Sequence, residues 1–83
     1  MPRTKRVIFR VARYHASTWP RLMWKLRWPW PGRSELFETK YRAVQAGRME
    51  AWLNKPSQLV VHGKDGRIQF DHTYGADPRR TKG

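Results

Sequence analysis

The stretch from Gln58 to Phe70, QLVVHGKDGRIQF, contains two strand-like runs separated by Gly63-Lys64-Asp65-Gly66. An Asp-Gly pair supplies the positive φ that a tight hairpin turn requires. The stretch therefore predicts strands over residues 58–62 and 67–70, joined as an antiparallel hairpin. Within it, we expect His62 to be a structural hydrogen-bonding residue that faces His72 or Tyr74 across the sheet.

A helix is predicted immediately before this hairpin. Thr39 is a suitable N-cap, and the helix is expected to run to about Asn54, where Lys55-Pro56-Ser57 breaks it. One stripe of the helix carries the residues Ala43, Val44, Gly47 and Ala51, which suit close packing on a short sheet. Away from this stripe lie three large apolar residues that form a possible protein interface: Met49, Trp52 and Leu53.

Two alternating segments precede the helix and predict strands over residues 6–13 and 22–28. We expect the apolar residues of each to face the core: Val7, Phe9 and Val11 in the first, and Leu22, Trp24, Leu26 and Trp28 in the second. The order is ββαββ, an α+β fold in which one antiparallel sheet carries a single helix on one face. We expect one domain over residues 1–83, with flexible basic tails at 1–5 and 79–83 and a Trp- and Arg-rich elaboration at 14–33.

The charge of the chain is strongly positive and unevenly distributed. Its 83 residues include 18 Lys+Arg and 6 Asp+Glu, a formal net charge of +12. Residues 1–33 contain nine of the cations and no acid. A charge this far above what solubility requires predicts a polyanionic partner. The first expectation is nucleic acid, DNA or RNA, bound through its phosphates with base stacking by exposed Trp residues.

The candidate contact residues come from the basic first third of the chain. Arg6, Arg10, Lys25 and Arg27 are expected to line one face of the first two strands, and Trp19 and Trp30 lie beside prolines in predicted loops. The candidate nucleic-acid-binding residues are Arg6, Arg10, Arg13, Arg21, Lys25, Arg27, Arg33, Trp19 and Trp30. Like charges opposite each other across strands are destabilising, so such a face suits a bound anion.

Three other classes of function can be weighed against this hypothesis. The alternative is a protein-interaction module, such as a ribosome-associated component or a small inhibitor that docks on a larger complex. A binder of anionic membrane surfaces is less favoured, because the helix lacks a clean basic amphipathic face. No catalytic triad, phosphate-binding glycine loop or carboxylate pair stands out, so we expect neither an enzyme nor a cofactor. The sheet edge can pair with a second copy, which leaves monomer and homodimer open.

Metal binding and export are also not expected. The chain has no Cys, and His15, His62 and His72 are too scattered for a ligand motif. Arg10 and Arg13 interrupt the apolar run that a secretory signal needs, and no stretch approaches the roughly 18 to 20 apolar residues that span a bilayer. A cytoplasmic location is the resulting expectation.

Residues Phe37 to Pro78 resemble the bacterial family known as domain of unknown function 2188. The resemblance rests on Thr39-Lys40, Ala43-Val44, the hairpin Leu59–Gln69 and the closing Tyr74-Gly75-x-Asp77-Pro78. It implies a ββαββ fold and brings no established activity. Members of that family usually have a short first hairpin around a Gly-rich turn and one Trp, whereas the segment from Tyr14 to Arg33 is extended here and contains four Trp.

Overall fold

The predicted C-terminal hairpin is present in the computed structural model, which describes residues 6–15 and 22–75. Strand β4 (Ser57–His62) pairs antiparallel with β5 (Ile68–Tyr74), which continues beyond the predicted end at residue 70. In the turn, Gly66 has a φ of 88°, and the Gly63 amide donates to the Arg67 carbonyl at 2.8 Å. The side chain of Asp65 accepts a hydrogen bond from the Arg67 amide at 3.0 Å. The Asp-Gly pair thus forms the turn that its sequence indicates.

The expected partner of His62 was wrong. Its Cα partner is Ile68, whereas His72 and Tyr74 pair with Leu59 and Ser57. A tight hairpin pairs the residues nearest its turn with one another, so His62 cannot reach the far end of β5. Its Nδ1 lies 3.0 Å from the Gly66 carbonyl oxygen, which confirms the expected structural role.

Helix α1 (Lys40–Leu53) begins and ends as predicted. The Thr39 hydroxyl caps it by accepting a hydrogen bond from the Arg42 amide at 3.1 Å, and the Asn54 amide donates to the carbonyls of the last turn. The small-residue stripe lies against the sheet, as predicted. A Cβ on Gly47 would lie 2.8 Å from Leu59 Cδ1, so glycine permits the close approach of helix and sheet at this point.

We expect Thr39→Ala to lower the free energy of unfolding by about 1 kcal/mol, because it removes the side-chain oxygen that caps the helix. Chemical denaturation measures the change. The matched control is Thr73→Ala at an exposed position of β5, where the same substitution should cost about 0.5 kcal/mol or less. Equal losses in the two variants would contradict the capping role.

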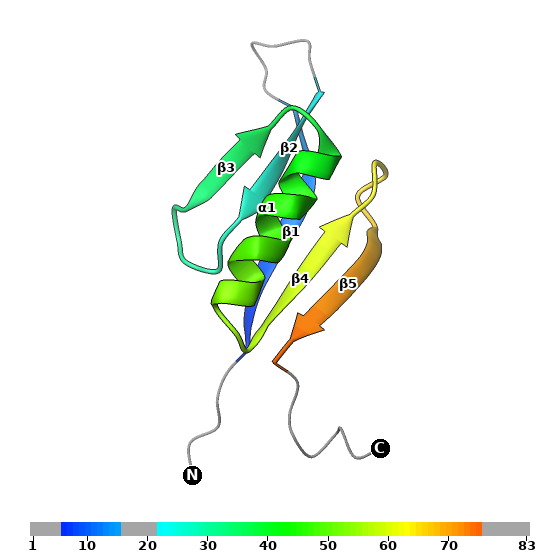
Figure 1. Cartoon of the computed structure of the whole chain (residues 1–83). Coiled ribbons are helices and arrows are strands. Elements are labelled where there is room, and N and C mark those ends of the chain that lie inside the picture. Colours follow the sequence, from blue (N-terminus) through cyan, green and yellow to red (C-terminus); the bar gives the residue numbers. More distant parts are fainter. Residues whose placement is uncertain (1–5, 16–21, 76–83) are drawn as a thin grey trace.

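The five strands form one sheet in the order β3-β2-β1-β4-β5, and α1 lies across one face of it (Figure 1). The remaining strands are β1 (Val7–His15), β2 (Leu22–Arg27) and β3 (Ser34–Phe37). The α+β class with one helix on one face is confirmed, and the strands over the first two alternating segments are present. The predicted tails at 1–5 and 79–83, and the residues after Gly75, lie outside the described residues.

Two features of the sheet differ from the expectation. Strand β3 was not predicted, and it pairs antiparallel with β2. Strands β1 and β4 pair in parallel, so the sheet is mixed and not wholly antiparallel. The parallel pair follows from the path of the chain. Because α1 returns the chain from the end of β3 to the end where β3 began, β4 runs in the same direction as β3 and β1.

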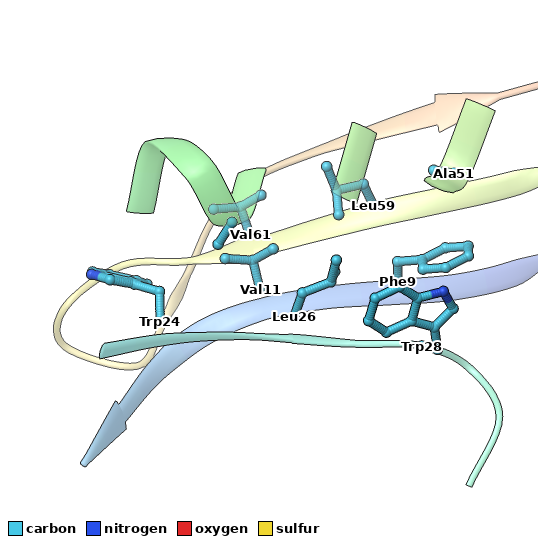
Figure 2. Packing of buried hydrophobic residues seen from close by; sticks show 9 residues of the cluster. Phe9, Val11, Trp24, Leu26, Trp28, Ala51, Leu59 and Val61 are labelled. Atoms are coloured by element: carbon cyan, nitrogen blue, oxygen red, sulfur yellow. The ribbon is translucent and has the colours of Figure 1, made fainter. Parts of the chain in front are cut away.

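The core lies between the sheet and α1 (Figure 2). Its largest members are Phe9, Val11, Trp24, Leu26, Trp28, Leu59 and Val61. Of the other residues predicted to face the core, Val7 is partly buried against this cluster, and the side chain of Leu22 lies outside the described residues. Trp24 and Trp28 are both buried, as expected. The Trp28 indole nitrogen donates to Glu50 Oε1 at 3.2 Å, which connects the end of β2 to the helix. Within residues 6–15 and 22–75, no helix has the length and apolar content needed to cross a membrane.

Candidate nucleic-acid interface

The face of the sheet opposite α1, which we call the open face, presents cations from its two N-terminal strands. Side chains alternate between the faces of a strand, and Phe9 and Val11 are buried under the helix. Arg10 between them therefore lies on the open face. By the same alternation, Trp24 and Leu26 face the helix while Lys25 and Arg27 lie on the open face.

Arg10 and Arg27 are direct partners across the β1–β2 ladder. Directly opposite residues in antiparallel strands have Cβ atoms about 4.5–5.5 Å apart, so two cations at such positions repel each other. Neither guanidinium forms an ion pair or side-chain hydrogen bond within the described part of the chain. We call Arg10, Lys25 and Arg27 the cationic stripe. Within the described residues, no acidic side chain therefore neutralises either guanidinium.

The acids near the sheet lie away from the cationic stripe. Glu35 of β3 pairs with Leu26, which places it on the helix side, and Glu50 accepts the hydrogen bond from Trp28. On the open face Asp71 belongs to the edge strand β5, where it accepts a hydrogen bond from Gln58 at 2.5 Å. Among the described residues of β1, β2 and β3, none on the open face is acidic. The described part of β1, β2 and β3 therefore gives the stripe no acidic neighbour on its own face, and Asp71 lies two strands away from Arg10.

Tyr14 extends the cationic stripe along β1. Its ring lies under the Lys25 ammonium, with 4.6 Å between the nitrogen and the ring centroid. Tyr14 was not among the predicted contact residues. The signal was available, because Tyr14 alternates with Arg10 on the same face of a strand. On the open face beside Arg10 lies Val60 of β4, which is only 5% exposed.

The connection from β2 to β3 forms a hollow at one end of the stripe. The Trp28 amide donates to the Arg33 carbonyl at 3.1 Å, and the Arg33 amide donates to the Trp30 carbonyl at 3.3 Å. Gly32 has a φ of 78°, which suits a residue without a Cβ. The hollow has a volume of about 380 Å³ and is lined by Lys25, Arg27, Trp28, Pro29, Trp30, Pro31, Gly32, Arg33 and Ser34. We call it the turn hollow.

Two side chains of the turn hollow have defined aromatic contacts. The Arg33 guanidinium lies 4.5 Å from the centroid of the Trp28 ring, in a cation–π contact. Trp30 contacts Phe9 edge-to-face, with 6.1 Å between ring centroids, yet 46% of its surface remains exposed. The expectation that Trp28 belongs to the core is confirmed. Trp30, in contrast, presents nearly half of its indole to solvent.

The remaining predicted contact residues do not join this group. Arg13 lies opposite Trp24 and, by alternation from Val11, on the helix side of β1. The structure therefore separates it from the cationic stripe. Arg6 is exposed and precedes β1. Arg21 and Trp19 lie outside the described residues.

The outer surface of α1 carries the three residues predicted as a protein interface. Met49, Trp52 and Leu53 are 59%, 56% and 67% exposed, so more than half of each is accessible to solvent. The Trp52 ring contacts Tyr74 edge-to-face, and the ammonium of Lys55 lies 3.7 Å from its centroid. This outer-helix cluster lies on the opposite side of the molecule from the open face.

The sequence of the chain matches a known family of bacterial proteins. The model of family DUF2188, described as uncharacterized proteins conserved in bacteria, matches residues 14–74. The matched region includes the Trp- and Arg-rich segment as well as the helix and the hairpin. No curated protein and no solved structure matches the chain.

Proposed function

The chain belongs to the DUF2188 family, and we propose that it binds nucleic acid by placing backbone phosphates against the cationic stripe. The observation that carries this proposal is the direct pairing of Arg10 with Arg27, without an acidic partner among the described residues. A polyanion supplies the missing counter-charge. The family itself is uncharacterized, so the argument rests on the chemistry of this face.

Phosphate chemistry suits the cations of the stripe. A guanidinium presents planar N–H donors that match phosphate oxygens in bidentate geometry, and an ammonium binds phosphate as a point charge. Arg10 and Arg27 lie side by side on neighbouring strands, and Lys25 is two residues from Arg27 on the same face. Successive phosphates along one backbone can therefore each contact a cation of the stripe. The net charge of +12 adds long-range attraction that increases the rate of encounter.

The test is the salt dependence of binding to a labelled duplex oligonucleotide, followed by fluorescence anisotropy. Each phosphate that the protein neutralises contributes about −0.9 to the log–log slope for duplex DNA, so three stripe cations should give a slope of about −2.7 or steeper. Binding that does not change with salt would contradict the proposal, because a phosphate-based interface releases counterions.

A second candidate function is contact with another protein through the outer-helix cluster. The observation that favours it is the exposure of Met49, Trp52 and Leu53, since adjacent exposed apolar residues commonly mark interfaces. Association with such a partner should be insensitive to salt and should be lost in Leu53→Lys. The same variant should leave oligonucleotide affinity within about twofold, because a single rim charge changes affinity little.

A further inference from the structure

We propose that the turn hollow holds one unpaired nucleotide, with its phosphate at Arg27 and Arg33 and its base against the exposed face of Trp30. This inference rests on the proposed function and adds a preference for single strands over duplexes. The cationic stripe recognises phosphates alone, which single and double strands share. The turn hollow adds a group that can recognise a base.

The chemistry of the lining indicates an anion that carries a planar ring. Three of the lining residues are cations, Lys25, Arg27 and Arg33, and no acid lines the turn hollow. Trp30 supplies an aromatic surface, 46% exposed, beside these charges. Cations that neutralise phosphate next to an aromatic side chain that stacks on a base are the combination found in single-strand binding sites. A free inorganic anion would leave the exposed part of the Trp30 indole without a contact.

The indole is held in position before any ligand binds. Trp30 stands between Pro29 and Pro31, whose rings fix the backbone φ on both sides. Two backbone hydrogen bonds close the turn, and the contact with Phe9 anchors the ring to the core. The Arg33 guanidinium is also restricted, because it packs over the Trp28 ring. Little conformational freedom is lost on binding, which favours affinity.

The size of the turn hollow excludes a duplex from it. A volume of about 380 Å³ lies near the lower end of the roughly 300–1,000 Å³ typical of small-ligand sites. It therefore suits one nucleotide. The bases of a duplex are paired and stacked inside the double helix, so they cannot reach the indole, whereas a single strand can turn a base outward.

The experiment compares three probes that carry the same number of phosphates per strand: a short single-stranded oligonucleotide, its abasic counterpart, and a duplex of the same sequence. Affinities are measured for the full chain, for Trp30→Ala, and for Trp30→Phe. The matched control is Trp52→Ala, because Trp52 is also an exposed indole, 56% exposed, but lies on the outer helix. Circular dichroism of each variant establishes that it is folded.

We expect Trp30→Ala to weaken binding of the single strand about 5- to 150-fold, the equivalent of one lost base stack. Trp30→Phe should restore most of this loss. Binding of the abasic strand and the duplex should change by about twofold or less, since stacking plays no part in either. Trp52→Ala should leave all three affinities unchanged.

Two results would overturn the inference while leaving the proposed function intact: equal affinity of the full chain for the single strand and its abasic counterpart, or an equal loss for all three probes in Trp30→Ala. The second result would mean that Trp30 acts only by supporting the cationic stripe. If none of the probes binds the full chain even at low salt, the proposed function itself fails.

Discussion

Replacing Arg10 and Arg27 together by glutamine is expected to weaken binding of a duplex oligonucleotide roughly 100-fold or more, since each substitution removes a hydrogen bond between charged groups that contributes about 1.5–3 kcal/mol. The log–log salt slope should become shallower by about 1.8, because two fewer phosphates are neutralised. Anisotropy titrations over a range of salt concentrations measure both quantities.

The same double variant should not be less stable than the natural chain. Arg10 and Arg27 repel each other across the ladder, so their neutralisation should raise the free energy of unfolding by about 0.2–1 kcal/mol. A gain in stability together with a loss of binding identifies residues that are kept for function at a cost to the fold. Denaturant unfolding of the free protein gives the stability change.

The matched control is Arg42→Gln together with Arg48→Gln. Both arginines are exposed on α1 and lie on the opposite side of the sheet from the stripe. This variant changes the net charge by the same amount. If it weakened binding as strongly as the stripe variant, binding would depend on the total charge alone and the open face would not be the site.

Phe9→Ala is expected to destabilise the fold by about 3–5 kcal/mol, as is typical for removal of a buried aromatic side chain. Phe9 is fully buried and contacts the rings of both Trp28 and Trp30. Globular proteins have stabilities of roughly 0.05–0.15 kcal/mol per residue, so this loss is a large share of the total for a short chain. Urea unfolding followed by Trp fluorescence measures it.

Phe70→Ala provides the same substitution at an edge-strand position that is 36% exposed. It should cost much less, about 1 kcal/mol, because less apolar surface is removed from the core. Comparable losses in the two variants would contradict the assignment of Phe9 to the centre of the core and of β5 to its margin.

Sequence reasoning located the helix and the hairpin because their signals act over a few residues. The Thr39 hydroxyl reaches an amide three residues away, and the Asp65-Gly66 pair determines the turn around itself. The buried stripe of α1 was predictable for a similar reason, since Gly47 is the kind of residue that close helix–sheet packing needs. Each of these features depends on local geometry.

Strand β3 and the parallel pairing depend on contacts between distant residues. Ser34–Phe37 is only four residues long and largely exposed, so its own pattern does not distinguish a strand from a loop. It becomes a strand by pairing with β2. The parallel pairing of β1 with β4 likewise depends on where the chain leaves α1, and not on the residues of β1. The sequence therefore supported the fold class better than the sheet topology.

For the candidate site, too, the sequence predicted which residues share a face of the sheet but not which residues pair across the strands. Alternation indicated that Arg10, Lys25 and Arg27 share a face, and it also separates Arg13 from them. The position of Arg10 directly opposite Arg27 depends on the offset between two strands, which no local pattern specifies. The turn hollow arises because the chain folds back after Trp28 to form β3, so it could not be anticipated without that strand.

The most direct test of nucleic-acid binding by the open face is an amide chemical-shift titration of the full chain with a short oligonucleotide. The account predicts saturable shifts at Arg10, Lys25, Arg27 and Arg33 and at the Trp30 indole N–H, with the outer-helix amides around Leu53 unaffected. Shifts confined to the outer helix, or no shifts at low salt, would contradict it.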